Sequence, residues 1–223
     1  MSLFKHKSAT NEDVAGGGDC SMFGLTLDQL KELIQLRGKE LMEKLNSSDY
    51  NGVEGVLEKL KVDKNKGLDS NNQQDLEQRR IAYGKNQIPR KQISYIPLTS
   101  AWRREHQFRH AVEESDKTPT SVLRDNRIQQ IPVIELVVGD LCFIKSGDFL
   151  PADGLIVQAN DLKVDQSSIT GETDLIKKNQ NEDVALFSGT EVKEGNGQMV
   201  VIGVGPNSYV GYVVSLLQAP ADS

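Results

Sequence analysis

Apolar residues recur at intervals of three and four positions along the first third of the chain, which is the spacing of an amphipathic helix. The first series runs from Leu27 to Leu45 and follows Thr26, which forms a capping-box pattern with Gln29. We therefore expect one helix to begin at Thr26, weakened in its middle by Gly38. The charged residues expected on its outer faces are Lys31, Arg37, Lys39 and Lys44.

Two shorter helices are expected next. Residues 53–60 place apolar side chains on one stripe, and the pattern from about Gln73 to Tyr83 predicts a third helix. Gly84 suits the left-handed residue that ends a helix, and Pro89 prevents its continuation. Three short helices indicate a small helical unit, and by pattern alone a regulatory or partner-binding bundle of any kind fits it.

From Val122 the pattern changes to short apolar runs separated by Gly, Pro and Asp. Asp125-Asn126 predicts a β-hairpin, and Gly195-Asn196-Gly197 predicts a turn into the last strand. Ser208 is expected to cap a final helix at 210–217. The expected strands are 122–124, 127–131, 141–145, 155–157, 162–164 and 198–204.

These elements predict an α+β fold, in which a small N-terminal helical region precedes a mainly β distorted sandwich or barrel with a C-terminal helix. A length of 223 residues suits one ordinary domain plus a smaller unit. The predicted parts are a disordered tail at 1–21, a helical region at 22–90, a linker at 91–120 and a β domain at 121–218.

Charge and cysteine usage narrow the class of protein. Acidic residues number 32 against 26 basic ones, for a net charge of -6, so nucleic acid is not expected as a partner. Cys20 and Cys142 are expected to be free thiols in a reducing compartment. Residues 1–19 lack the apolar segment of a secretory signal, and no stretch approaches the ~18–20 apolar residues that span a bilayer. The chain alone is therefore expected to be soluble and cytoplasmic.

The linker mixes aromatic and basic residues from Trp102 to His110. A tryptophan and a phenylalanine among arginines are typical of a segment at a membrane surface, and an exposed helix end fits equally well. His106 and His110 are one helical turn apart, but no third ligand is near, so no metal site is expected.

A polar loop directly follows a predicted strand, at 165–173. Gly171 lets the backbone turn tightly and approach another surface, and Glu172 then presents a carboxylate from the tip. Such a carboxylate can hold a water molecule and take its proton while the water attacks an electrophile. Thr170-Gly171-Glu172 alone is also a common turn tripeptide, so a solvated loop without chemistry is the alternative.

Several motifs stand in one order along the β region. They are Val138-Gly139-Asp140, Gly147-Asp148, Pro151-Ala152-Asp153-Gly154, Asp165 to Glu172, Ser188-Gly189-Thr190, Glu194-Gly195 and Val204-Gly205. Their order and spacing resemble the actuator domain of P-type ATPases over about 122–217. A series of spaced motifs is specific where any single one is weak.

The N-terminal region resembles the cytosolic start of one branch of this family, the plasma-membrane-type calcium pumps. The matching segments are Phe23-Gly24, 27–30, Leu36-Arg37-Gly38, 75–80 and 83–86, with 105–109 resembling the stalk after their second transmembrane helix. Calcium as the transported ion rests on this resemblance.

The resemblance implies a role for each residue of the loop. In the family the actuator carries this loop to a phosphorylated Asp on a separate domain during ATP-driven ion transport. Glu172 would orient and activate the attacking water, while Thr170 and Gly171 would shape the loop. Thr173 departs from the usual Ser but keeps the hydroxyl, and Gln166 stands where an acidic residue is common.

Cofactors and partners follow from the same resemblance. No cofactor or metal is expected in this chain, whereas the intact pump would use Mg-ATP and transport Ca²⁺ at the cytosolic face of the plasma membrane. The partner would be the phosphorylation domain, in cis in an intact pump and in trans here. Membrane contact is expected only through the intact pump or weakly at the linker. Asp153 and Asp165 are expected to fix turns.

The chain also departs from the family. Two transmembrane helices expected between about Leu98 and Trp102 are missing, and we expect this chain to lack the phosphorylated Asp, the nucleotide pocket and the ion-binding helices as well. The segment 116–120 is similar to the phosphorylation motif, but Pro119 replaces its Gly and the segment leads into the hairpin, so no phosphorylation site is expected there.

We therefore expect a fragment of a calcium-transporting P-type ATPase, whose actuator serves the hydrolysis of the aspartyl phosphate and which is not active alone. The alternative is a non-enzymatic interaction module that binds or competes with a full-length pump. A non-functional gene-model fragment is a third interpretation.

Overall fold

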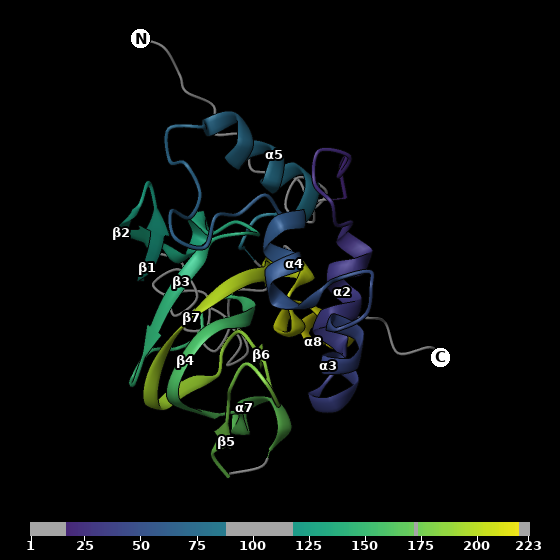
Figure 1. Ribbon diagram of the computed structural model, residues 1–223. Coiled ribbons are helices and arrows are strands. Elements are labelled where there is room, and N and C mark those ends of the chain that lie inside the picture. The colour runs from purple at the N-terminus through teal and green to yellow at the C-terminus, as the bar shows by residue number, and fades with distance from the viewer. Residues whose placement is uncertain (1–16, 88–117, 172–173, 219–223) are drawn as a thin grey trace, which may run out of the picture.

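The computed structural model describes residues 17–87, 118–171 and 174–218. Figure 1 shows helices gathered beside a curved antiparallel sheet, and four of those helices precede the sheet in the chain. Within the described residues the sheet has seven strands in the order β2-β1-β3-β7-β4-β5, with β6 paired to β4. The predicted α+β fold is confirmed, and the sheet is open, not closed into a barrel.

The N-terminal helices begin and end near their predicted positions. They are α2 (Leu27–Gln35), α3 (Gly38–Leu45), α4 (Gly52–Lys59) and α5 (Gln73–Tyr83). The predicted capping box is present: the Thr26 hydroxyl accepts a hydrogen bond from the Gln29 amide at 3.3 Å, and the Gln29 side-chain oxygen accepts one from the Thr26 amide at 2.9 Å. Gly84 ends α5 with φ +92°.

The prediction of one continuous first helix is wrong. The backbone is extended at Leu36 and Arg37 and becomes helical again at Gly38, where φ is +46°. Glycine adopts this left-handed φ without steric cost, so Gly38 separates two helices. The break also turns Arg37 away from its predicted outer face, and its guanidinium lies over the ring of Phe187.

The strands follow the helices along the chain. They are β1 (Pro119–Arg124), β2 (Arg127–Pro132), β3 (Leu141–Lys145), β4 (Asp153–Asp165), β5 (Ile176–Lys177), β6 (Ala185–Leu186) and β7 (Glu191–Gly203). The predicted hairpin joins β1 and β2. Asp125 and Asn126 at its turn have φ of +53° and +59°, as a type I′ turn requires.

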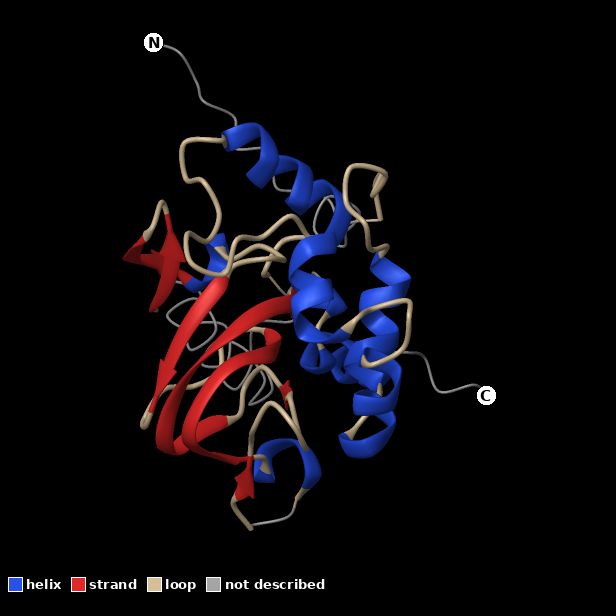
Figure 2. Cartoon of the chain, viewed as in Figure 1, coloured by secondary structure: helices blue, strands red, loops and turns tan. Residues whose placement is uncertain are grey.

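The two long strands differ from the prediction. Residues 155–157 and 162–164 belong to the single strand β4, which bulges where its register with β7 shifts. A bulge leaves residues of a continuous strand without a partner in the neighbouring strand. The bulged part of β4 includes polar residues, so its sequence pattern is the same as that of a loop between two strands. Figure 2 shows β4 and β7 as long curved ribbons that run side by side.

The predicted turn at Gly195-Asn196-Gly197 is also wrong. Asn196 lies within β7, opposite Lys145 on one side and Asn160 on the other. Gly195 has φ +77°, and a β-carbon there would come within 2.3 Å of the Asn160 carbonyl oxygen. The glycine therefore permits a bulge and a close strand approach without reversing the chain.

Short helices complete the fold. They are the 3-10 turns Val133–Glu135 and Gly205–Asn207 and the α-helices α7 (Ser167–Thr170) and α8 (Tyr209–Gln218). The predicted cap is confirmed, because the Ser208 hydroxyl accepts a hydrogen bond from the Gly211 amide at 3.1 Å.

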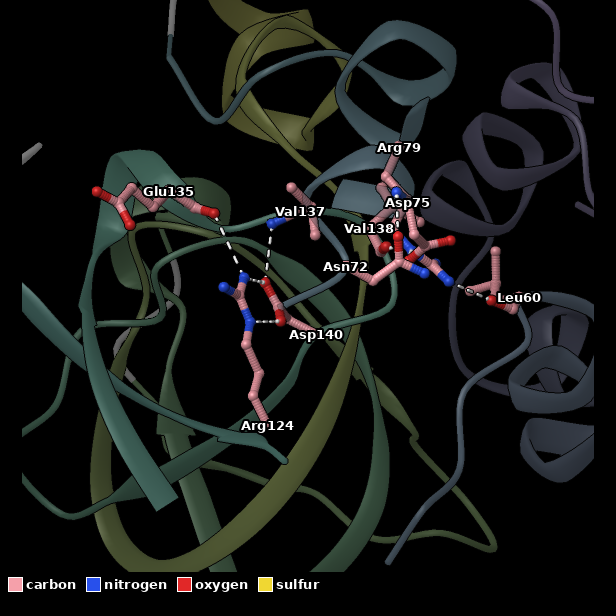
Figure 3. Close-up of polar contacts among 9 residues, drawn as sticks. All are labelled: Leu60, Asn72, Asp75, Arg79, Arg124, Glu135, Val137, Val138 and Asp140. Carbon is pink, nitrogen blue, oxygen red and sulfur yellow. Dashed lines mark hydrogen bonds and ion pairs between the residues drawn. The ribbon is translucent and has the colours of Figure 1, made fainter. Parts of the chain in front are cut away.

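One apolar core joins the helices to the sheet, since buried Leu, Ile and Val residues of both regions belong to one cluster. α2 packs against β7, and α4 packs against β4. The boundary between 22–90 and 121–218 stays a prediction. Arg79 of α5 bridges the two regions, because it donates to the carbonyl oxygens of Leu60 at 2.9 Å and Val138 at 3.1 Å (Figure 3).

Most of the predicted linker lies outside the described residues, including Trp102, His106, His110 and the first two residues of segment 116–120. Pro119 and Thr120 belong to β1, in the hairpin where the sequence placed them. None of the helices in 17–87, 118–171 and 174–218 has the length and apolar composition that crossing a bilayer requires.

Candidate functional site

The loop that leaves β4 begins with a fixed turn. The Asp165 carboxylate accepts a hydrogen bond from the Ser167 amide at 2.9 Å. Hydrogen bonding by the Ser167 side chain, and then by its amide, lowers the pKa of Asp165. The short helix α7 follows and ends at Gly171, whose amide donates to the Ser167 carbonyl oxygen at 2.9 Å. Asp165 therefore fixes the start of the loop, as predicted.

Gly171 is exposed and has φ +75°, in the left-handed region. A β-carbon at this position would have no heavy atom within 4 Å, so backbone conformation and not space favours glycine here. Thr170 is the last residue of α7. Glu172 and Thr173 lie outside the described residues, so the position of the predicted carboxylate stays a prediction.

The far end of the loop returns to β4. Asp174 and Leu175 are exposed, and β5 then pairs with β4 through Ile176 opposite Val164. The Lys178 amide donates to the Leu162 carbonyl oxygen at 2.9 Å. The loop is thus held to the same strand at both ends, and Figures 1 and 2 show α7 and β5 together at the end of the molecule opposite α5.

Asp153, at the other end of β4, is buried and binds backbone in two places. One carboxylate oxygen accepts the Ser188 amide at 2.7 Å, and the other accepts the Tyr209 amide at the start of α8. Burial raises the pKa of Asp153 to about 6. The structure agrees with a structural role for this carboxylate, although it joins three segments and does not simply fix a turn.

Other motif residues also serve the scaffold. Asp140 pairs with Arg124 and accepts the Val137 amide at 2.9 Å (Figure 3). Asp148 accepts the Lys145 amide at 3.1 Å and so closes the turn after β3. These contacts give Asp140 and Asp148 structural roles beside the sheet.

Sequence reasoning missed Arg37. Its guanidinium carbon lies 3.9 Å from the ring centroid of Phe187 and 4.8 Å from that of Tyr209. The break at Leu36-Arg37-Gly38 allows the side chain to leave the helical pattern, but no local signal identifies Phe187 and Tyr209 as its partners.

Cysteine chemistry agrees with the prediction of free thiols, since Cys20 and Cys142 form no disulfide. Cys142 is fully buried, and burial raises the pKa of its thiol. Among the described residues, no group of three His, Cys, Asp or Glu side chains is placed to hold a metal ion.

Two family models match the chain. The model described as P-type ATPase actuator domain matches residues 114–218, and the model described as cation transporter/ATPase N-terminus matches residues 48–98. The actuator match contains the loop, Asp153 and the whole sheet.

Similar full-length proteins agree with these matches. Plasma membrane calcium-transporting ATPase 3 of Homo sapiens is 33% identical over 97% of this chain and 23% of its own length. Plasma membrane calcium-transporting ATPase 1 of Gallus gallus is 33% identical over 90% of this chain and 22% of its own length. Plasma membrane calcium-transporting ATPase 2 of Oreochromis mossambicus is 32% identical over 97% of this chain and 26% of its own length. This chain therefore spans about a quarter of the relatives that it matches, and it belongs to the P-type cation-transporting ATPases, of which it carries an N-terminal region and an actuator domain.

Proposed function

We propose that this chain serves as the actuator part of a calcium-transporting P-type pump, in which Glu172 positions the water that hydrolyses the aspartyl phosphate. The geometry beside Glu172 carries the proposal. The preceding residue, Gly171, is exposed and left-handed, and the next described residue, Asp174, is exposed as well. Both ends of the loop are bonded to β4, through Ser167 and Lys178.

The chemistry needs one carboxylate and a phosphate held elsewhere. A carboxylate that takes a proton from the attacking water accelerates such a step by about 10²–10⁴-fold. Thr170, Gly171 and Thr173 would shape the approach of the loop to a phosphorylated Asp on another domain. The phosphorylation domain is therefore the proposed partner, and Mg-ATP would be bound outside this chain.

Relatives named plasma membrane calcium-transporting ATPases support Ca²⁺ as the transported ion and the cytosolic face of the plasma membrane as the location. The alignment with the human protein extends over 291 residues, more than the 223 of this chain, so the relative has residues without a counterpart here. A pair of transmembrane helices missing between about Leu98 and Trp102 would account for them.

A chimeric pump tests the proposal. Residues 17–87 and 118–218 of this chain replace the matched segments of human plasma membrane calcium-transporting ATPase 3, which keeps the other parts of that pump. The expected result is calcium-dependent ATP hydrolysis that falls by about 100-fold or more with Glu172→Ala. Phosphoenzyme should still form from ATP in the variant.

Asp174→Ala is the matched control, because Asp174 is an exposed carboxylate two positions from Glu172. It should leave ATP hydrolysis within about twofold of the unchanged chimera, as surface substitutions do. An active chimera that tolerates Glu172→Ala would exclude the proposed role of Glu172.

A further inference from the structure

Arg37 lies at the break between α2 and α3 and is held there by its own backbone. Its guanidinium donates to the carbonyl oxygens of Ile34 and Leu36, the latter at 2.8 Å. These bonds place the guanidinium carbon over two rings of the β region, 3.9 Å from the centroid of Phe187 and 4.8 Å from that of Tyr209. The two rings contact each other with centroids 5.6 Å apart. A side chain from the break between α2 and α3 is thus packed against an aromatic pair of the actuator.

A second cation shares the Phe187 ring. The ammonium of Lys178 lies 5.7 Å from the Phe187 centroid and pairs with the Asp183 carboxylate at 2.7 Å. Only 2% of the Lys178 side chain is exposed. Cations contribute most to aromatic contacts when they are desolvated, so the burial of Lys178 strengthens this junction.

Carboxylates compensate the two cations. Burial lowers the pKa of Arg37 and of Lys178, and the nearby carboxylates of Asp153 and Asp183 act against that effect on Arg37. Asp183 does the same for Lys178. The junction is therefore a partly desolvated cluster of two cations, two carboxylates and two rings, in which the carboxylates offset both the burial of the cations and the repulsion of Lys178 by Arg37.

The cluster reaches the loop through backbone bonds. Lys178 ends the segment that returns from the loop tip, and its amide is bonded to the Leu162 carbonyl oxygen of β4. Phe187 precedes Ser188, whose amide is bonded to Asp153. Packing at Phe187 therefore holds the returning segment against β4, and Arg37 supplies the part of that packing that comes from the N-terminal helices.

We propose that Arg37 is a positioning residue: by stacking on Phe187 and Tyr209 it clamps the N-terminal helices onto the segment that follows the Thr170-Gly171-Glu172 loop, and so fixes the placement of that loop. The N-terminal helices then help to position the loop of the actuator, and they are not only a separate bundle. The effect on phosphate hydrolysis rests on the proposed function, whereas the clamp itself does not.

Hydrogen exchange on the full 223-residue chain tests the clamp. With Arg37→Ala, the amides of Lys178 and Ser188 should exchange about tenfold faster, because one desolvated cation–π contact is lost locally. The amide of Val192, which is bonded to the Asp148 carbonyl oxygen, should stay within about twofold. Unchanged exchange at Lys178 and Ser188 would overturn the inference, and so would an equal increase at Val192, since Arg37 would then only stabilise the whole fold.

Three further variants test whether the effect depends on the position of the cation, on its flat shape and on the Phe187 ring. Lys39→Ala removes a cation two positions away whose side chain is 91% exposed, and it should change none of these amides. Arg37→Lys keeps the charge but loses the flat stacking surface, so it should give an intermediate increase. Phe187→Leu removes the ring from the β side and should reproduce Arg37→Ala, which keeps the test open if Arg37→Ala does not fold.

The chimeric pump separates this inference from the proposed function. Arg37→Ala should slow decay of the aspartyl phosphate about tenfold while the amount of phosphoenzyme formed stays constant. A merely stabilising Arg37 would lower that amount and leave the decay rate unchanged. If Glu172→Gln slows decay and Arg37→Ala does not, the positioning role of Arg37 is excluded and the proposed function of the loop stands. If Glu172→Gln has no effect, the proposed function fails, and hydrogen exchange still decides the clamp.

Discussion

Arg124 and Asp140 form a buried two-point ion pair. The Arg124 Nε donates to one carboxylate oxygen at 2.7 Å and Nη2 donates to the other at 2.6 Å (Figure 3). The two side chains are 5% and 0% exposed. The pair connects the β1–β2 hairpin to the turn before β3, so the edge of the sheet depends on it.

Asp140→Ala is expected to lower the free energy of unfolding by about 3–5 kcal/mol, because it leaves a buried guanidinium without its partner. Urea denaturation followed by circular dichroism measures this loss. The control is Asp148→Ala, which removes a partly exposed carboxylate and should cost about 1 kcal/mol. A loss below about 1 kcal/mol for Asp140→Ala would show that the pair does not support the fold.

Arg79 and its neighbour Arg80 offer a matched comparison on α5. Arg79→Met leaves two buried carbonyl oxygens, those of Leu60 and Val138, without their donor, so a loss of about 3 kcal/mol is expected. Among the residues that the structure describes, Arg80 pairs with Glu77, whose side chain is 54% exposed, so Arg80→Met should cost about 0.5 kcal/mol or less. Equal losses in urea denaturation would contradict the bridging role of Arg79.

Asp153 gives the fold a specific pH dependence. Burial raises its pKa to about 6 from an ordinary value of 3.8, although the amides of Ser188 and Tyr209 act to lower it. A raised carboxyl pKa means that the folded chain binds the proton more tightly than the unfolded chain. Protonation of Asp153 therefore adds stability as the pH falls from 7 to 5, by about 1 kcal/mol.

The measurement is the difference in unfolding free energy between the unchanged chain and Asp153→Asn at each pH. The unfolding free energy of the unchanged chain minus that of Asp153→Asn should increase from pH 7 to pH 5. Asp125 is the control, because hydrogen bonds from Ser70 and Gln129 lower its pKa to about 2, so its contribution is lost only at much lower pH. The Asp125→Asn difference should stay flat from pH 7 to 5, and a flat Asp153→Asn difference would contradict the assignment.

Gly171 is predicted to act through backbone conformation alone. Gly171→Ala should cost about 1–2 kcal/mol in local stability, because alanine is strained at φ +75° and nothing surrounds the new β-carbon. Gly171→Asn should cost less, since asparagine adopts left-handed φ more readily. Hydrogen exchange at the Gly171 amide, which is bonded to Ser167, measures the difference. Identical exchange in both variants would show that φ is not the constraint.

Local signals explain which elements the sequence predicted. The Thr26–Gln29 capping box, helix α5 and the Asp125-Asn126 hairpin are each determined within a few residues, and all are confirmed. The sequence pattern predicts shorter strands in place of β4 and β7, because the bulges of these strands contain glycine and polar residues. Such residues have the same pattern in a bulge as in a turn.

The features of the site also divide into those set by local sequence and those set by contacts between distant residues. A left-handed glycine before Glu172 and a turn fixed by Asp165 follow from local sequence, and both are present. The inward turn of Arg37 could not be predicted, because its partners Phe187 and Tyr209 are distant in the chain and meet it only in the fold. Asp153 gained a raised pKa from burial, which pattern alone does not reveal.

The decay of the aspartyl phosphate in the chimeric pump, followed after a chase with unlabelled ATP, tests the role of Glu172 most directly. With Glu172→Gln as the only change, phosphoenzyme should form to its usual level and decay about 100-fold more slowly, while Asp174→Asn decays at the usual rate. Equal decay rates for Glu172→Gln and the unchanged chimera would contradict the account.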